Sequence, residues 1–304
     1  AGLVLWIALR PIAVDDAFIT YRYARNLATG RGFTYNLGEP VLSTTAPLYA
    51  VLLAAGALVW ADIPTLANAF AASALVAGSI LVFGLGKREG APWVGALAGL
   101  FYVVHPLLWL SLGLETNAFL ALALASIVAY RSGHLHRAAL WAGLATLIRG
   151  DGLILAAVLA ADYLLGWWPR KGMGEAARES GQDRPLGRVV GGTVVYLAVV
   201  LPFLSWLAWK FGSPLPATLS AKVAQAELGV TGFYPHTSYL QGLVILLQAR
   251  LNQSPLYLLF IPAVVGGLLG SWRGSNWVRL VAFWGAAQVV AYTLLGVTPY
   301  YWYY

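Results

Sequence analysis

Residues 65–86 read TLANAFAASALVAGSILVFGLG, a run that contains no charged side chain. A transmembrane helix needs about 20 consecutive apolar residues, so this run is long enough to cross a bilayer. The whole chain has the same character, because 60% of its residues are hydrophobic and only 10% are charged. This composition excludes an ordinary water-soluble globular protein and predicts an all-α polytopic membrane protein.

Further apolar runs lie on both sides of this segment, separated by short stretches of Gly, Pro and charged residues. We expect membrane spans at 65–86, 91–111, 116–131, 189–210, 254–271 and 277–296, after the remnant of a first span that ends before Arg10. The apolar start at 1–9 is too short to cross a bilayer, and the chain stops at VTPYYWYY. We therefore interpret the chain as a fragment of a longer protein.

Three apolar runs are shorter than a full span. The runs at 137–148 and 152–168 flank the sequence IRGDG, and we expect two short helices that meet in a turn there. The run at 46–61 contains Pro47 and ends at an Asp-Ile-Pro sequence. It predicts a re-entrant helix or a helix that lies in the membrane interface.

The basic residues indicate the orientation of the module. Eleven of the 19 Lys and Arg residues fall on one face of the predicted topology, and such residues concentrate in cytoplasmic loops. They are Lys87, Arg88, Arg131, Arg137, Arg170, Lys171, Arg178, Arg184, Arg188, Arg273 and Arg279. We therefore expect one transmembrane module over 1–304, with a cytoplasmic loop at 169–188 and an extracytoplasmic loop with juxtamembrane helices at 10–61.

The opposite face of the predicted topology gathers polar and acidic residues. They are Asp15, Asp16, Glu39, Glu115, Asp151, Lys222, Glu227 and His236. A charge at the bilayer centre costs about 2.5–3.5 kcal/mol on insertion scales, so charges in such a chain mark boundaries or functional sites. This concentration predicts a functional site on the extracytoplasmic face.

Several other functional classes find no support in the sequence. No internal repeat or inverted symmetry is visible, which disfavours a secondary transporter. The absence of Cys excludes disulfides, thiolate catalysis and Cys-based metal sites. The sequence also contains no Walker motif and no GxSxG nucleophile motif.

The acidic pair Asp15–Asp16 precedes AFITYRYARNLATG, a stretch with helical composition that ends in a glycine. One interpretation is helix capping, which explains one Asp more easily than two. The other interpretation is catalysis, because Tyr21, Arg22 and Arg25 follow within three turns. Carboxylates, a phenol and two arginines in this order could hold a hydroxyl group beside a phosphate.

Four segments resemble the GT-C glycosyltransferases, polytopic enzymes that use lipid-phosphate sugars. The segments are DDAFITYRYARNLATGRGFTYNLGEPVLSTTAPLYA, LGLETNAFLALAL, LIRGDGLIL and PLPATLSAKV. Within this superfamily the chain is most similar to the actinobacterial cell-wall arabinofuranosyltransferases, and the protein O-mannosyltransferases are wider relatives. The resemblance covers about residues 10–225 in order. It implies a GT-C-like transmembrane helical bundle.

The resemblance also implies an inverting reaction with a polyprenyl-phosphate sugar as donor. Asp15 and Asp16 match the acidic pair in the first extracytoplasmic loop of the family, where one carboxylate is expected to be the general base on the acceptor hydroxyl. The leaving polyprenyl phosphate is anionic and needs positive partners. The candidates on the predicted face are Arg22, Arg25, Arg149 and Lys222.

The remaining candidate residues each have a structural alternative. Glu115 matches a Glu-Thr pair of the family and could instead favour a helix N-terminus. Arg149 and Asp151 correspond to an Arg-Pro-Asp-Gly turn, with Gly150 in place of proline, and could form an internal ion pair. Lys222 could contact a phosphate or extend along the interface. His236 lies in a loop and could touch donor or acceptor.

The resemblance implies no obligatory metal and no cofactor besides the donor. Expected partners are the lipid-linked sugar, membrane lipids and a glycan, lipid or protein acceptor, and we expect no nucleic acid. The expected location is a bacterial plasma membrane with the active site on the extracytoplasmic side. The alternative is a non-catalytic GT-C-like membrane subunit of a larger assembly.

Overall fold

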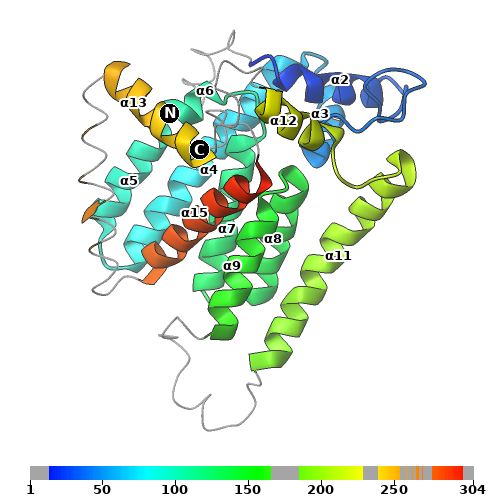
Figure 1. The fold of residues 1–304 in the computed structure, drawn as a ribbon. Coiled ribbons are helices and arrows are strands. Elements are labelled where there is room, and N and C mark those ends of the chain that lie inside the picture. The colour runs from blue at the N-terminus through cyan, green and yellow to red at the C-terminus, as the bar shows by residue number, and fades with distance from the viewer. Residues whose placement is uncertain are drawn as a thin grey trace. The chain divides into compact units, whose positions relative to one another are not determined.

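The structure is a computed structural model that describes residues 14–165, 185–228, 239–253 and 276–296, with isolated positions between 258 and 269. These residues form helices and no strand (Figure 1). The helices are α2 (Ala17–Ala28), α3 (Pro47–Ala57), α4 (Ile63–Arg88), α5 (Pro92–Val104), α6 (Pro106–Leu110), α7 (Thr116–Arg131), α8 (Leu135–Ile148), α9 (Gly152–Leu165), α11 (Pro185–Phe211), α12 (Ala217–Leu228), α13 (Tyr239–Gln253) and α15 (Asn276–Leu295). The predicted all-α class is confirmed for this part of the chain.

Four helical segments of the described residues are long and apolar enough to cross a membrane. They are Ile63–Arg88, Pro92–Leu110, Gly187–Phe211 and Val278–Leu295. They correspond to the predicted spans at 65–86, 91–111, 189–210 and 277–296, which are confirmed as long apolar helical segments.

The fifth predicted span, 116–131, is helix α7, but its 16 residues place it among the shorter apolar helices. At 1.5 Å per residue it is about 24 Å long, less than the roughly 30 Å of the hydrocarbon core. The sixth, 254–271, lies almost entirely outside the described residues, as do the remnant before Arg10 and the loop at 169–188 up to residue 184.

The predicted short helices are also present. Helix α8 ends at Ile148 and α9 begins at Gly152, so they meet at the IRGDG turn as expected, although residues beyond 165 in the second run are not described. Helix α3 begins at Pro47, whose fixed backbone suits the first turn of a helix.

The described residues fall into two compact units. The first comprises 14–156 and 185–217, and the second comprises 157–165, 218–228, 239–253 and 276–296. In the first unit α4 packs against α5 and α7, α8 against α7 and α11, and α2 against α3. In the second unit α13 packs against α15, where the rings of Tyr239 and Tyr292 lie 5.0 Å apart.

Glycines bring the backbones of α4 and α5 into contact. A Cβ on Gly86 would lie 2.3 Å from the Cα of Gly95. Gly99, one turn further along α5, accepts a 3.0 Å hydrogen bond from the hydroxyl of Ser79 through its carbonyl. Small residues four apart are typical of close helix pairs in membranes, where packing and interhelical hydrogen bonds drive association. The pair α4–α5 is therefore a tightly packed helical hairpin.

This contact predicts unequal effects for two glycines of α4. Gly86→Ala is expected to lower the free energy of unfolding by about 1–3 kcal/mol, because the added methyl group meets the backbone of α5. The matched control is Gly84→Ala, where a Cβ meets nothing within 4 Å. That variant should be neutral or slightly more stable, since alanine favours helix. Unfolding in detergent measures both, and equal losses would contradict the close packing.

The loop between α2 and α3 is fastened to α2 by side-chain hydrogen bonds. The amide of Asn26 donates to the carbonyl oxygens of Thr34 and Tyr35 at 2.9 and 3.1 Å. The hydroxyl of Tyr23 donates to the carbonyl of Val41 and accepts the N–H of Ser43. The loop therefore holds a defined course over α2.

The same loop contributes to an apolar core of the first unit. Tyr23, Phe33 and Leu42 are buried together with Ala50 of α3 and Leu207 of α11. This core fixes the extracytoplasmic loop predicted at 10–61, as far as it is described, against the end of a long apolar helix. Helix α2 is thereby held in place.

Candidate functional site

The acidic pair lies in a turn directly before α2. Asp16 occupies the N-cap position, but its backbone is already helical, with φ −55° and ψ −30°, and its carboxylate makes no capping hydrogen bond. Asp15 is exposed, and its Oδ1 accepts the N–H of Asp16 at 2.9 Å. The capping interpretation therefore does not account for the carboxylate of Asp16.

A buried ion cluster lies where α7 begins and α8 ends. The guanidinium of Arg149 donates from Nε to Asp151, and its Nη1 lies 3.5 Å from the Glu115 carboxylate and 3.4 Å from the hydroxyl of Thr116. Glu115 and Arg149 are only 7% and 8% exposed. We call Glu115, Thr116, Arg149 and Asp151 the Glu115 cluster. The internal Arg149–Asp151 pair expected as the structural alternative is confirmed.

The local backbone explains how these side chains meet. Arg149 leaves α8 in an extended conformation, with φ −155° and ψ 129°, which turns the chain toward α9. Gly152 then begins α9 against the backbone of α8, because a Cβ there would lie 2.3 Å from the amide nitrogen of Thr146. Gly150 is exposed and has open space around it, so the turn tolerates the absence of proline.

Tyr21 joins α2 to the turn that precedes Glu115. Its hydroxyl donates a 3.0 Å hydrogen bond to the carbonyl of Gly113, and the hydroxyl of Tyr49 lies 3.4 Å from the same oxygen. Gly113 has φ +85°, and a Cβ there would lie 2.4 Å from the Tyr21 hydroxyl. Both the backbone angle and the contact require glycine. Burial and the nearby Glu115 carboxylate raise the pKa of Tyr21, so the phenol remains a donor.

Electrostatics connects Asp16 to the Glu115 cluster. Burial raises the pKa of the Glu115 carboxyl above its usual range, Arg149 partly opposes this shift, and the charges of Asp151 and Asp16 add to it. The hydrogen bond from Tyr21 to Gly113 brings α2, which Asp16 precedes, to the turn before Glu115. Helix α2 and the turn that leads to the Glu115 cluster therefore meet at the Tyr21–Gly113 contact.

The two arginines of α2 are exposed. Arg22 donates to the carbonyl of Tyr35 and to Oδ1 of Asn36, both at 2.9 Å, and its guanidinium lies 4.5 Å from the ring centre of Tyr35. Arg22 and Arg25 are both exposed, whereas Tyr21 is buried. Tyr21 of α2 therefore contacts the turn before Glu115, whereas Arg22 contacts the loop after α2 and Arg25 is exposed.

The structure does not describe the side chains of two predicted residues. Lys222 belongs to α12, in the second compact unit, and its side chain is not among those described. His236 lies outside the described residues. Among the residues that the structure does describe, no group of three His, Cys, Asp or Glu side chains has an arrangement that could hold a metal ion.

The sequence interpretation missed Asn68, which lies beneath the site. Asn68 is 2% exposed, and neither its amide nitrogen nor its amide oxygen has a hydrogen-bond partner within the described part of the chain. Its Oδ1 would be 3.2 Å from a Cβ on Gly113, which places it beside the Tyr21–Gly113 contact. The sequence did contain a signal for this residue, because a polar amide inside the apolar run 65–86 is costly to bury without a hydrogen-bond partner.

Comparison with known proteins adds no relative. No protein-family model, curated protein or solved structure matches this chain. The chemistry open to the site therefore follows from its own residues. A carboxylate such as Asp15 or Asp16 can accept the proton of a hydroxyl group, so general-base chemistry is open to this part of the chain.

Proposed function

We propose that this protein is a membrane-embedded inverting glycosyltransferase that takes a sugar from a polyprenyl-phosphate donor on the extracytoplasmic face. The observation that carries the proposal is the convergence of the Asp15–Asp16 turn with the Glu115 cluster. Acidic residues gathered from separate parts of an apolar chain are expensive, so they mark a site. Three of the four segments that resemble GT-C enzymes contain these residues.

In the proposed reaction a carboxylate of the pair removes the proton of the acceptor hydroxyl. The acceptor oxygen forms a bond to the anomeric carbon while the bond from that carbon to the phosphate oxygen breaks, and its electron pair leaves with the polyprenyl phosphate. Attack opposite the leaving group inverts the anomeric centre. Asp16 is our first choice as base, because it is the half-buried member of the pair and its residue lies five positions before Tyr21, which contacts the turn before Glu115.

Arg149 has a positioning role in this proposal. Its guanidinium is bonded to Glu115 and Asp151, so its charge offsets two carboxylates. The phosphate then needs other cations, and Arg25 on the exposed side of α2 and Lys222 are the candidates. The phosphate would be stabilised by charge rather than by protonation.

The test is transfer of labelled sugar by membranes that contain the protein, with a panel of polyprenyl-phosphate sugars. We expect one donor to be consumed and its sugar to appear on an acceptor with inverted configuration. Membranes without the protein give the background. If no donor is consumed above this background, the protein is better explained as a non-catalytic membrane subunit.

A further inference from the structure

Two side-chain contacts join the end of α4 to the end of α7. Nη2 of Arg131 lies 2.7 Å from the carboxylate of Glu89, and Arg88 donates a hydrogen bond to the hydroxyl of Ser132. Helix α7 begins after Glu115 and has 16 residues, so its length is about 24 Å. The two contacts therefore lie at the end of α7 that is remote from the Glu115 cluster.

His136 connects the start of α8 to the start of α11. A Cβ on Gly191 of α11 would lie 2.6 Å from Nε2 of His136, so the imidazole lies against the backbone of α11. Arg188 lies one turn before Gly191, on the same face of α11, and Arg137 follows His136 in α8. Since only residues 132–134 separate α7 from α8, these helix starts lie at the same end of the unit as the ends of α4 and α7.

The charges of this unit are divided unequally between its two ends. Its basic end carries five cations, which we call the basic rim: Lys87, Arg88, Arg131, Arg137 and Arg188. Glu89 is the one acidic residue at this end among the described residues, whereas six acidic and five basic residues lie at the other end. Residues 166–184, outside the described part, contain four basic and three acidic residues and so bring no net negative charge. The rim therefore has an excess of positive charge that an anionic partner would offset.

The helices that carry the rim have surfaces suited to lipid. Val190 of α11 is 53% exposed and Leu140 of α8 is 37% exposed. Leu140 lies one turn after Arg137 on the same face of α8. Arg188 is the second residue of the segment Gly187–Phe211, which is long and apolar enough to cross a membrane, so its guanidinium belongs at the level of the lipid headgroups. A lipid chain along Leu140 would bring a headgroup phosphate to Arg137 and Arg188.

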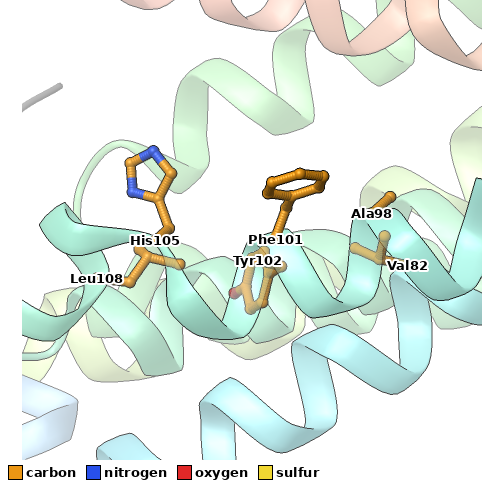
Figure 2. A pocket seen from close by; sticks show the side chains of 6 residues that line it. All are labelled: Val82, Ala98, Phe101, Tyr102, His105 and Leu108. Carbon is orange, nitrogen blue, oxygen red and sulfur yellow. The ribbon is translucent and has the colours of Figure 1, made fainter. Parts of the chain in front are cut away.

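The groove beside α5 and α6 offers different chemistry. Its lining residues are Val82, Ala98, Phe101, Tyr102, His105 and Leu108. Figure 2 shows that Phe101 and His105 project to one side of the helix. None of the six is Lys or Arg, so this lining gives an anionic headgroup no cation of fixed charge. The basic rim is therefore the place in the described part of the chain that best suits an acidic lipid.

We propose that the basic rim binds the headgroup of an acidic phospholipid, with the phosphate at Arg137 and Arg188 beside His136. In the predicted orientation the rim lies in the cytoplasmic leaflet, whose lipid surface is negative. A guanidinium can donate two parallel hydrogen bonds to a phosphate, and these are stronger than bonds between neutral groups. A zwitterionic headgroup brings its own cation and gains less from the rim. This inference does not depend on the proposed glycosyltransferase activity, because the rim and the Glu115 cluster lie at opposite ends of α7.

The experiment is native mass spectrometry of the purified protein in detergent, with equal amounts of phosphatidylglycerol and phosphatidylcholine of the same chain length. We expect the Kd for phosphatidylglycerol to be lower by about tenfold or more. Arg137→Gln and Arg188→Gln should each weaken phosphatidylglycerol binding about fivefold, the contribution of one cation near an acidic headgroup. Phosphatidylcholine binding should stay unchanged, which also shows that the variants remain folded. The matched control is Lys210→Gln at the other end of α11, which should leave both affinities unchanged.

Equal affinity of the parent protein for the two lipids would overturn the proposal. So would equal losses in Arg188→Gln and Lys210→Gln, because binding would then follow the net charge of the protein rather than the rim. Excess inorganic phosphate separates a lipid headgroup from a free anion. We expect phosphatidylglycerol to stay bound, since its acyl chains add apolar burial that inorganic phosphate lacks. Complete displacement by phosphate would assign the rim to a soluble anion and contradict the lipid site.

Discussion

Asp16→Asn is expected to lower the rate of sugar transfer by about 10²- to 10⁴-fold, the usual contribution of a general base. The amide is the same size as the carboxylate but cannot accept the proton of the acceptor hydroxyl. The measurement is the initial rate of transfer in membranes with equal amounts of folded protein.

Two further variants show whether the effect belongs to Asp16. Glu39→Gln removes a carboxylate from the exposed loop after α2 but keeps an acceptor for the 2.9 Å hydrogen bond from Asn36, so transfer should continue at the parent rate. Asp15→Asn tests the other member of the pair. If Asp16→Asn transfers at the parent rate while Asp15→Asn does not, Asp15 is the base.

Arg149→Met is expected to destabilise the protein by about 3–5 kcal/mol, the cost of breaking a buried ion pair by removing one partner. Methionine fills similar space but leaves the Glu115 and Asp151 carboxylates without their cation. A carboxyl whose pKa is higher in the folded state than in the unfolded state stabilises the fold at low pH. This contribution is lost as the pH rises through the folded-state pKa. The loss in the variant should therefore shrink as the pH is lowered toward the usual pKa of about 4.5.

The matched control for this variant is Arg131→Met. Arg131 lies 2.7 Å from Glu89, but the two side chains are 18% and 30% exposed, so water compensates for the lost partner. Exposed pairs contribute about 0–1 kcal/mol, and this variant should show a change of that size. Unfolding of both variants in detergent over a pH series measures the difference, and losses of similar size would show that burial of the Glu115 cluster contributes little.

The helices could be predicted because each is specified by its own residues. Length and hydropathy alone placed α4 and α15 to within two residues at each end. Helix α7 has the predicted bounds but is too short by itself to cross the hydrocarbon core, since composition does not reveal how a bundle accommodates a short helix. The break at His105 was not predicted within the span 91–111, although the proline that follows it disfavours continuation of a helix.

The contacts within the site were harder to predict from the sequence. The Arg149–Asp151 pair was expected because the two residues are neighbours in one turn. The contact of Tyr21 with Gly113 and the burial of Asn68 depend on how α2, α4 and the turn before α7 pack together. Sequence spacing does not determine such packing, and the outward direction of Arg22 depends on a loop whose course is set by its own hydrogen bonds.

The helical hairpin of α4 and α5 has a consequence for the synthesis of the protein. Its two helices are joined by a tight turn in which Gly90 has φ +74°, and their glycine contact requires no later part of the chain. The hairpin can therefore enter the bilayer and pack as a unit while the ribosome is still adding α7 and α8. A preformed hairpin then offers a template on which the later helices assemble.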